Sequence, residues 1–462
     1  MGKIKVGLEI HGYLNTKEKL FCKCSTNILD EPNKNICPIC TSQPGAKPMI
    51  PNKEAFNKVL KLALIFNSKI NLKSNFQRKH YSWPDLPSGY QRTISGSYSS
   101  FSAIGGSFKG IRIKEIHLEE DPAAWDPKTG KINYNRAGFP LVEIVTEPDF
   151  DSSEIIKKWL QELILYSSYL DIFNNKLNIK SDVNVSIEES GFKRVELKNV
   201  NSFSNIVRAV EVEVERQREL IKNGKEIKQE TRRFNEELDT TEFMRSKENA
   251  EDYMFIPEPD LPNIIIDEKY INNLKKEIPE LPHEKREKYK QLGLKNEDIE
   301  VLVSNLYLTE LFEHALDKGL KPKEVGLFLR REIMRVLNYN KGTFKDLENK
   351  NIKNEISQLL ELLSSEKISY TTAQKIIEKL WEEKFDVDKY VKENNLIQVQ
   401  DTKKIEELVN KALKEAPKAV EDYKCGNSKA LNFIVGIVMR ETKGTADPKI
   451  VNKVLLEEVK KF

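Results

Sequence analysis

Residues 112–121, RIKEIHLEED, put a histidine and three consecutive carboxylates between a strand-like run and Pro122. Alternate side chains of a strand share a face, so His117 and Glu119 lie on one side. Glu120 joins them only at a bulge or where the strand ends. A buried carboxylate is strongly destabilising unless it is paired or bound to a metal. This stretch therefore predicts a strand whose polar face receives water or a cation.

Four other stretches divide in the same way into an apolar and a polar face: KVGLEIHGY (5–13), FPLVEIVTEPD (139–149), SDVNVSI (181–187) and KRVELKN (193–199). Their polar faces carry Glu9, His11, Glu143, Asp182, Asn184, Glu196 and Lys198. A half-solvated antiparallel sheet explains any one of these strands. For five together this explanation weakens, because a solvated face usually mixes Lys and Thr with its acids. We therefore expect a carboxylate-lined antiparallel sheet.

Such a face is typical of a site for Mg²⁺ and a nucleotide. Mg²⁺ prefers carboxylate oxygens, tolerates a neutral imidazole and bridges protein carboxylates to phosphate oxygens. The common glycine-rich phosphate loops are absent from the sequence, so basic side chains would take that role. Arg233, Arg245 and Lys247 are candidates, although each alone is more often a surface salt-bridge residue.

Four of the five cysteines lie between residues 22 and 40, as Cys22-x-Cys24 and Cys37-x-x-Cys40. Two closely spaced pairs separated by a polar loop are typical of a tetrahedral Cys₄ zinc site, which holds together a loop that is too polar to fold by burial. The alternatives are buried reduced thiols and a redox pair. Cys425 stands alone, and we interpret it as a small apolar residue.

The composition is that of a folded globular protein, with 39% apolar and 32% charged residues in a chain of 462. A net charge of +3 provides no global basic field, so any nucleic-acid contact has to be local. No apolar run is long enough to span a membrane, and the first residues enter a strand pattern without the apolar core of a signal peptide. We expect a cytoplasmic protein.

Three domains are predicted. Residues 1–285 mix strand patterns with a few helices and contain the cysteine loop, so they predict an α+β domain. Proline-rigid loops in this domain, PDLP at 84–87 and 259–262, are suited to hold side chains at the rim of a site. Residues 286–396 predict an all-helical domain, and residues 397–462 predict a separate helical tail.

Further motifs occur in a fixed order with those above, among them RKHYSWPDLPSGYQ, YNRAGFPLVEIVTEPDF, VELKNVNSF, QETRRF and MRSKENAEDYMFIPEPDLP. Together they resemble the B subunits of tRNA-dependent amidotransferases (GatB) over the whole chain. The resemblance implies a catalytic cradle similar to glutamine synthetase and guanido kinases, followed by a helical domain and a tail domain. It also implies a ligase that forms a carbon–nitrogen bond with glutamine as amido donor.

The implied reaction uses ATP and Mg²⁺ to phosphorylate the side-chain carboxylate of Asp on tRNA(Asn) or of Glu on tRNA(Gln). Ammonia then displaces phosphate to give the amide. The resemblance places five residues in the catalytic set: Glu9, His11, Glu119, Glu120 and Glu143. Within it, His11, Glu120 and Glu143 would bind Mg²⁺. The nucleotide and acyl-phosphate pocket would be lined by Asp182, Asn184, Glu196, Lys198, Arg233, Arg245 and Lys247.

The sequence offers no ammonia source of its own. The Gly/Ser stretch AIGGSFKG (103–110) is too short for an amidase-type Ser-Ser-Lys site, and Cys425 has no histidine near it in the sequence. A partner glutaminase is therefore predicted. The resemblance identifies it as the amidase A subunit, and a small C subunit would complete a heterotrimer.

The tail is the expected contact for misacylated tRNA. Residues 401–462 hold 13 Lys and Arg against 10 Asp and Glu, a surplus as large as that of the whole chain. The candidates for phosphate contact are Lys424, Lys429, Arg440, Lys443 and Lys449. Any single one of them is as readily a solvated residue of a helical bundle.

Two other functions remain open at this point. A free-standing glutamine synthetase-like ligase for a small carboxylic acid would explain the carboxylate sheet, but neither the cysteine loop nor the helical extension. A zinc-containing RNA-binding adaptor without catalysis would explain the cysteines and the tail alone. The sequence does not decide between Asp-tRNA(Asn) and Glu-tRNA(Gln) as substrate.

Overall fold

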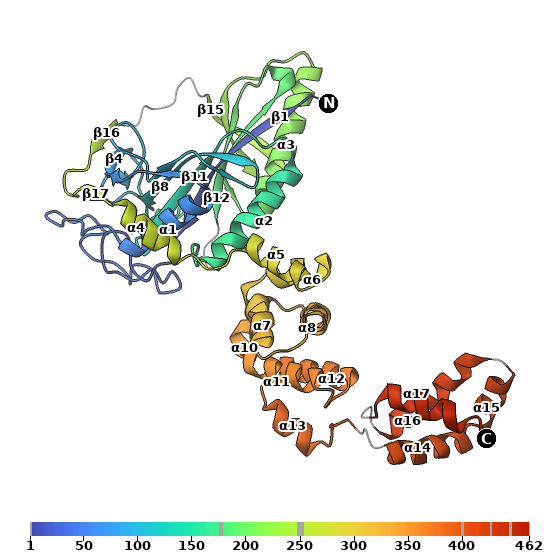
Figure 1. The fold of residues 1–462 in the computed structure, drawn as a ribbon. Helices are drawn as coiled ribbons and strands as arrows, with labels where there is room; N and C mark the ends of the chain where they lie inside the picture. The colour runs from blue at the N-terminus through green and yellow to red at the C-terminus, as the bar shows by residue number, and fades with distance from the viewer. Residues whose placement is uncertain are drawn as a thin grey trace. The chain divides into compact units, whose positions relative to one another are not determined.

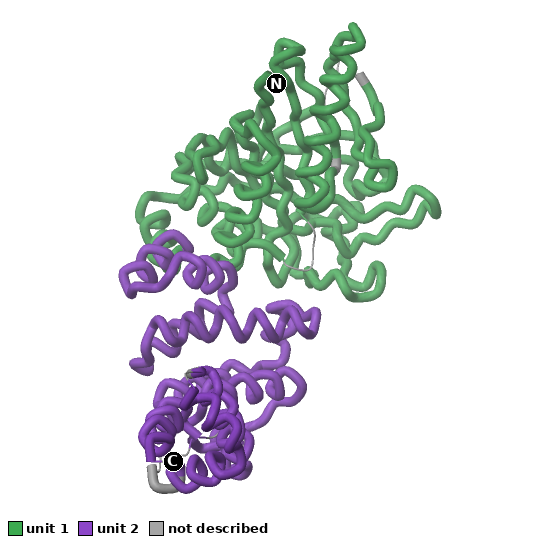
Figure 2. The backbone as a smooth tube through the Cα atoms, turned by 90° about the vertical axis from the view of Figure 1, so that its right-hand side faces the viewer, with its two compact units in different colours: residues 1–281 green, residues 282–462 purple. Residues whose placement is uncertain are grey.

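The chain forms two compact units in a computed structural model, residues 1–281 and residues 282–462 (Figure 2). The structure describes residues 2–174, 179–246, 254–398, 402–425, 427–442 and 446–461. The predicted three-domain division, with boundaries at 285 and 396, stays a prediction. Among the helices of the described residues, none has the length and apolar character needed to cross a membrane.

A large mixed sheet dominates the first unit (Figure 1). Its main strand order is β15-β14-β13-β12-β1-β11-β8-β5-β4-β16, and β2, β6 and β7 pair near β8. The strands of this sheet are β1 (Ile4–Tyr13), β2 (Lys69–Ile70), β4 (Gln77–His80), β5 (Tyr90–Thr93), β6 (Ala103–Ile104), β7 (Ser107–Phe108), β8 (Ile111–Glu120), β11 (Pro140–Thr146), β12 (Lys180–Ile187), β13 (Val195–Asn201), β14 (Glu230–Asn235), β15 (Thr240–Ser246) and β16 (Met254–Pro257). Two small pairs lie outside it, β3 (Lys73–Ser74) with β17 (Ile264–Ile265) and β9 (Ala124–Trp125) with β10 (Ile132–Asn133).

The five strands predicted from alternation are neighbours in this sheet, in the order β13-β12-β1-β11-β8, and each adjacent pair is antiparallel. The sheet extends beyond the five predicted strands, and there it is mixed, because β13 and β14 are parallel. The long helix α3 (Phe203–Lys222) connects them and returns the chain to the same end of the sheet. Parallel neighbours require such a crossover.

Helices cover the apolar face of the sheet. The residues Val6, Leu8 and Ile10 of β1 are fully buried and share one core with residues of α1 (Lys53–Ile65), α2 (Ser153–Tyr169) and α3. Helices α2 and α3 contact each other along this face, as Figure 1 shows. The short helix α4 (Glu268–Lys276) packs against α1. The alternate, polar residues of the same strands therefore face away from this core.

The second unit is helical, as predicted. Its helices are α5 (Pro282–Gln291), α6 (Asn296–Val303), α7 (Leu306–Asp317), α8 (Pro322–Phe328), α9 (Met334–Tyr339), α10 (Phe344–Lys350), α11 (Lys353–Ser364), α12 (Tyr370–Glu382), α13 (Val387–Glu393), α14 (Thr402–Glu415), α15 (Pro417–Lys424), α16 (Leu431–Glu441) and α17 (Pro448–Glu458). A π-helical turn, Leu329–Ile333, joins α8 to α9. The last four helices share a core of their own, which includes Val409 and Val438.

Candidate functional site

Strand register brings histidines and acids from three strands together on the polar face. Glu143 of β11 lies opposite His117 of β8 on one side and opposite His11 of β1 on the other. Its Oε2 atom lies 2.9 Å from Nε2 of His117 and 3.4 Å from Nε2 of His11. Nε2 of His11 also lies 4.0 Å from Oε1 of Glu119. His11, Glu119 and Glu143 thus converge on one small space.

The electrostatics of this group are those of strongly interacting charges. Burial lowers the pKa of His11, but the adjacent Glu143 carboxylate outweighs it and raises that pKa to about 9. Burial would raise the pKa of Glu143, yet the charges of His117 and His11 hold it well below its usual range. Burial, reinforced by Glu143, raises the pKa of Glu119. These acids are close enough to repel each other unless a cation joins them.

The group has the composition and size for a hard divalent cation. His11, Glu119 and Glu143 each offer one ligand atom, and these atoms lie within 4.8 Å of one another. In an octahedral Mg²⁺ site with ligands at about 2.1 Å, ligand atoms are about 3 Å apart when adjacent and about 4 Å apart when opposite. The residues therefore fit Mg²⁺ after only small side-chain movements.

A second acidic group stands beside the first on the same face. Glu9, Asp182 and Glu196 offer oxygens that lie within 4.8 Å of one another. The ammonium of Lys198 bridges this group, at 2.5 Å from Oδ2 of Asp182 and 3.1 Å from Oε1 of Glu196. Asn184 donates to Glu9 at 3.2 Å. Burial raises the pKa of Glu9, and Glu143 raises it further, so the two groups are coupled.

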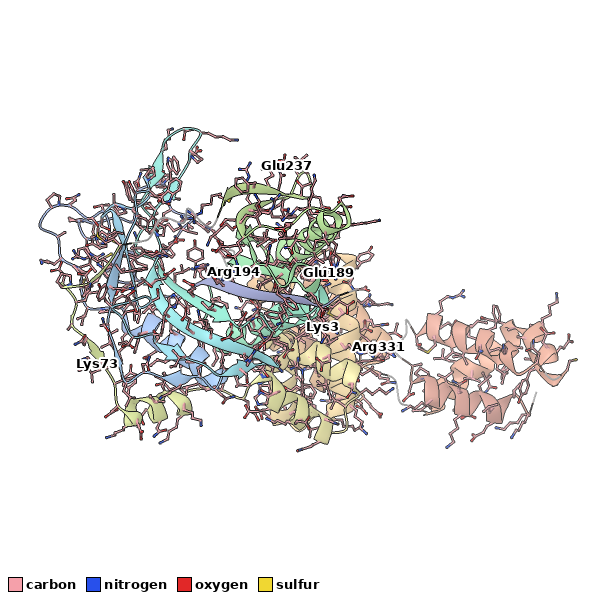
Figure 3. All side chains as sticks on the ribbon, turned by 90° about the horizontal axis from the view of Figure 1, so that it is seen from above. Lys3, Lys73, Glu189, Arg194, Glu237 and Arg331 are labelled. Carbon is pink, nitrogen blue, oxygen red and sulfur yellow. The ribbon has the colours of Figure 1, made fainter. Side chains whose placement is uncertain are left out.

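Two of the predicted basic residues, Arg233 and Arg245, lie on strands that extend the same polar face. Arg233 of β14 lies opposite Lys198 and forms an exposed ion pair with Glu242 of β15. Arg245 is exposed and lies opposite Thr231, whose hydroxyl donates to Glu196 at 3.0 Å. The β14–β15 hairpin ends in a turn that carries Glu237, at the rim of the unit in Figure 3. Lys247, also predicted here, lies outside the described residues.

Glu120 has a different environment from Glu119, although both were predicted to be catalytic. It ends β8 and is not part of the group formed by His11, Glu119 and Glu143. Its carboxylate accepts from the backbone N–H of Arg92 at 3.0 Å and from the guanidinium of Arg92 at 3.1 Å. The assignment of Glu120 to Mg²⁺ therefore remains only a prediction, and Glu119 stands where that ligand was expected.

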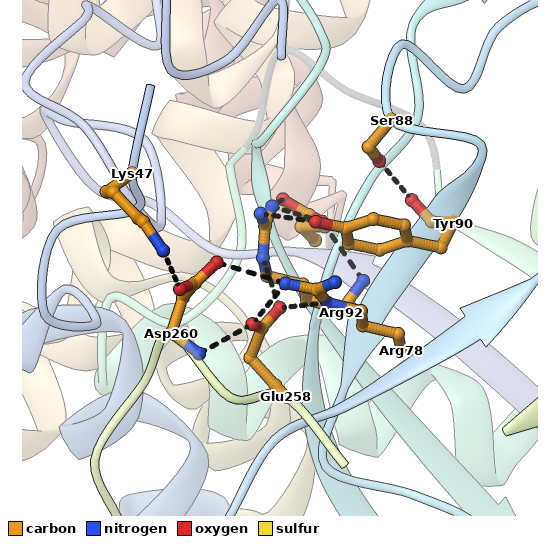
Figure 4. A network of polar contacts seen from close by, with 8 residues as sticks. Lys47, Arg78, Ser88, Tyr90, Arg92, Glu258 and Asp260 are labelled. Atoms are coloured by element: carbon orange, nitrogen blue, oxygen red, sulfur yellow. Dashed lines mark hydrogen bonds and ion pairs between the residues drawn. The ribbon is translucent and has the colours of Figure 1, made fainter. Parts of the chain in front are cut away.

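An ion-pair network that sequence reasoning missed holds Arg92 in place (Figure 4). The buried carboxylate of Glu258 accepts from Nε of Arg92 at 2.9 Å and from two nitrogens of Arg78, at 2.8 and 3.0 Å. Arg78 also contacts Asp260, which pairs with Lys47, seven residues after the last cysteine of the cysteine loop. The sequence contained part of the information needed to predict this network, because Glu258 and Asp260 belong to the segment that carries the second PDLP motif.

A further polar cluster closes one end of the face. The carboxylate of Asp121 is buried between the Tyr13 hydroxyl, at 3.1 Å, and Nε of Arg136, at 2.7 Å. Burial lowers the pKa of Lys180, and the Arg136 charge lowers it further. Both residues belong to stretches singled out in the sequence: Asp121 ends residues 112–121, and Tyr13 shares a strand face with Glu9 and His11. No local pattern predicts the contact between Tyr13 and Asp121.

The four clustered cysteines meet as predicted. The Sγ atoms of Cys22, Cys24, Cys37 and Cys40 lie within 4.8 Å of one another, and those of Cys37 and Cys40 are 3.9 Å apart. Sulfur ligands of a tetrahedral zinc ion, at about 2.3 Å from the metal, are about 3.8 Å apart. The hydrogen bond from Cys22 lowers the pKa of Cys40 to about 5, and the ammonium of the buried Lys19 contributes. The donor set therefore fits zinc, while Cys425 is exposed and stands apart.

Of the five tail residues predicted to contact tRNA, the four that the structure describes are on the surface. Lys424 ends α15, Arg440 lies in α16 and Lys449 lies in the first turn of α17, and all three are exposed. Lys429 is exposed in the turn between α15 and α16, where Asn427 accepts its backbone N–H. Lys443 lies outside the described residues.

The first unit thus combines a sheet face lined by carboxylates and histidines with a group of four cysteines, and comparisons identify the class of protein. Residues 4–272 match the family model for the GatB/GatE catalytic domain, and residues 310–459 match the GatB domain. The chain belongs to the family of aspartyl/glutamyl-tRNA(Asn/Gln) amidotransferase B subunits. The resemblance seen in the motifs is confirmed.

The relatives are similar along their whole length. The B subunit of the aspartyl/glutamyl-tRNA(Asn/Gln) amidotransferase of Methanocaldococcus jannaschii is 43% identical over 472 residues, covering 99% of this chain and 98% of the relative. The protein of the same name from Methanothermobacter thermautotrophicus is 42% identical, covering 99% of this chain and all of the relative. That from Methanobrevibacter smithii is 43% identical, covering 98% and 99%.

Proposed function

We propose that this chain acts as the B subunit of a glutamine-dependent, tRNA-dependent amidotransferase, a ligase that forms a carbon–nitrogen bond. Its substrates would be Asp-tRNA(Asn), Glu-tRNA(Gln) or both. In the proposed reaction, an oxygen of the substrate side-chain carboxylate attacks the γ-phosphorus of ATP, and ADP leaves. Ammonia then attacks the acyl carbon, phosphate leaves, and the amide of Asn-tRNA(Asn) or Gln-tRNA(Gln) remains.

The observation that carries this proposal is the convergence of His11, Glu119 and Glu143 next to the second group of Glu9, Asp182 and Glu196. Phosphoryl transfer to a carboxylate needs little covalent help from the protein, but it needs two anions to be brought together. A face with two adjacent acidic groups, bordered by Lys198, provides the anchoring points for metal-bound phosphate. Bound Mg²⁺ would supply charge neutralisation on the phosphate oxygens.

The residues of this chain would have separate roles. His11, Glu119 and Glu143 would hold the cation, since they combine His and Glu donors whose ligand atoms converge. Lys198, Arg233 and Arg245 border the second acidic group and would neutralise phosphate charge. Arg92 fixes the carboxylate of Glu120 at the end of β8, where Glu120 would position the acceptor.

Other parts of the proposal concern zinc, partners and location. The Cys₄ group would bind a structural zinc ion. An amidase A subunit would deliver ammonia, a small C subunit would complete the heterotrimer, and the exposed cations of the tail would contact the tRNA backbone. The likeness of the sheet to glutamine synthetase and guanido kinases is part of this proposal, as is a cytoplasmic location, where translation takes place.

The test separates the proposal from a ligase for a small carboxylic acid. The purified chain with its A and C partners, ATP, Mg²⁺ and ammonium chloride is given Asp-tRNA(Asn), Glu-tRNA(Gln), free aspartate or free glutamate, and amide formation is measured. The proposal expects amide only on an aminoacylated tRNA. Amide formation on a free amino acid would favour the small-molecule ligase, and no ATP-dependent product at all would favour a non-catalytic adaptor.

A further inference from the structure

An aromatic pair stands on the two loops that border the end of β8. Trp83 is 58% exposed, although a large apolar side chain in that position gains nothing from water. Its ring centroid lies 5.9 Å from that of Trp125, at an interplanar angle of 44°. Trp83 lies between β4 and β5, and Trp125 lies in β9, so the pair joins segments that are far apart in sequence.

A backbone hydrogen bond connects the Trp83 loop with the segment that follows β8 and leads to Trp125. Ala123 donates to the carbonyl of Asp85 at 2.8 Å, which ties the Trp83 loop to the segment after β8. Trp125 is five residues from Glu120, so their Cα atoms are at most about 18 Å apart even if the chain between them is fully extended. Trp125 is therefore within about 18 Å of the residue that ends β8, next to the acidic face.

A cavity of about 430 Å³ adjoins Trp125. Its walls come from the hairpin β9–β10 and from the cysteine loop, and they include Pro32, Asn33, Trp125, Lys131, Ile132 and Asn133. Asn33 fastens one wall to the other: its backbone N–H donates to Asn133 at 3.1 Å, and its side chain donates to the carbonyl of Ile132 at 3.1 Å. The walls are therefore held in place before any ligand binds.

We propose that Trp83 and Trp125, with this cavity, form a stacking platform for the unpaired 3′-terminal bases of the aminoacylated RNA. This inference rests on the proposed function, because the reacting carboxylate belongs to an amino acid esterified to the terminal ribose. The terminal bases must then lie one ribose and one amino-acid backbone away from the carboxylate face. Exposed aromatic rings bind unstacked bases of any sequence, and the amide and ammonium groups of Asn133 and Lys131 supply polar contacts.

The platform also gives the cysteine loop a role in substrate binding. Pro32 and Asn33, between the two cysteine pairs, form the wall opposite the hairpin. A zinc ion in the Cys₄ group would therefore maintain the shape of this binding site in addition to stabilising the loop.

The first experiment measures tryptophan fluorescence of the full-length chain with its A and C partners while RNA is added. The probes are intact uncharged tRNA(Asn), the same RNA shortened by its 3′-terminal nucleotides, and ATP alone. We expect quenching by the intact RNA, little quenching by the shortened RNA and none by ATP, and we expect Trp83→Phe and Trp125→Phe each to reduce the signal. Equal quenching by the shortened RNA, or quenching by ATP alone, would overturn the platform.

A kinetic experiment separates binding of the RNA from a purely structural role of Trp83, because only RNA binding changes the KM for aminoacyl-tRNA selectively. Trp83→Ala should raise the KM for aminoacyl-tRNA roughly tenfold, with kcat and the KM for ATP nearly unchanged, and Trp83→Phe should restore most of the affinity. Phe243→Ala is the matched control, because Phe243 is 59% exposed on β15 at the other end of the sheet. An unchanged KM in folded Trp83→Ala contradicts the inference but leaves the proposed function intact. A wild-type complex without amidation activity contradicts the proposed function, while the quenching data still decide on the platform.

Discussion

The carboxylate of Glu143 lies 3.4 Å from the imidazole of His11 on the neighbouring strand. Because cross-strand partners in a sheet share a face, this contact places two potential metal ligands on the same side as Glu119. Experiments can distinguish how these two side chains interact without a bound cation and with one. Without a cation the two side chains form an ion pair, and with a bound cation we expect both to be ligands.

Adjacent glutamates provide the sharpest test of the cation site. Glu119→Gln removes a ligand oxygen from the His11 group and should weaken Mg²⁺ binding at least tenfold, measured by calorimetry without nucleotide. Glu120→Gln changes a neighbour that contacts Arg92 instead, so Mg²⁺ affinity should stay within about twofold while amidation falls. If Glu120→Gln abolishes Mg²⁺ binding and Glu119→Gln does not, Glu120 is the Mg²⁺ ligand and Glu119 is not.

The stability of the metal-free protein should fall as the pH rises. The pKa of His11 is raised to about 9 in the folded protein from 6.5, although burial opposes this, because Glu143 stabilises the imidazolium. The stabilisation is fully present below pH 6.5 and is lost as the pH passes 9, since the folded state then gives up its bound proton. Thermal unfolding between about pH 6 and pH 9.5 should therefore show a decline that His11→Asn removes. His314→Asn, in the helical unit, is the control.

Added Mg²⁺ should alter that pH dependence, because only the neutral imidazole binds a metal. The apparent Mg²⁺ affinity of the wild type should increase from pH 6.5 towards pH 9. A pH-independent affinity would mean that His11 is not a ligand.

The cysteine loop should depend on zinc. Purified protein should contain about one zinc ion per chain, and Cys40→Ser should lose it and unfold at a lower temperature. A strong chelator should have the same effect on the wild type. Cys425→Ser, at an exposed position, should retain both the zinc and the unfolding temperature. Metal-free wild-type protein with unchanged unfolding would show instead that the thiols are simply buried and reduced.

The network around Glu258 should contribute strongly to stability. Glu258→Gln leaves the guanidinium groups of Arg78 and Arg92 without their shared carboxylate, and should lower the free energy of unfolding by about 3–5 kcal/mol. Glu237→Gln, at the tip of the β14–β15 hairpin, should change it by less than about 0.5 kcal/mol. Denaturant unfolding of both variants measures the difference. Equal stability of the two would mean that the network does not hold the 257–260 segment to β5.

Local patterns predicted the five central strands, because a period of two is visible within seven residues. They also predicted the polar face of β12, where Val183 and Val185 are buried on the opposite side. Strand order and the parallel β13–β14 pair were not predictable in the same way, since pairing depends on contacts between distant residues. Glu258 and Arg92, for example, are 166 positions apart.

The candidate site was predicted less completely for a related reason. Glu119 and Glu120 are consecutive, so a shift of one residue at the end of β8 exchanges their faces. The sequence left open whether the strand bulges there, and the structure shows Glu120 turned toward Arg92. The residues Tyr13, Asp121 and Arg136 were missed because their contacts form only after three separate segments meet.

One measurement tests the central claim most directly: ATP consumption by the complex with its A and C partners and Mg²⁺, in the presence of Asp-tRNA(Asn), Glu-tRNA(Gln) or the uncharged tRNAs. The account predicts ATP turnover only with an aminoacylated tRNA, and a loss of at least a hundredfold, about 2.7 kcal/mol, in Glu143→Gln. Glu211→Gln, on the helix-covered side, should keep full turnover. Turnover that is indifferent to tRNA charging, or unchanged in Glu143→Gln, would contradict the account.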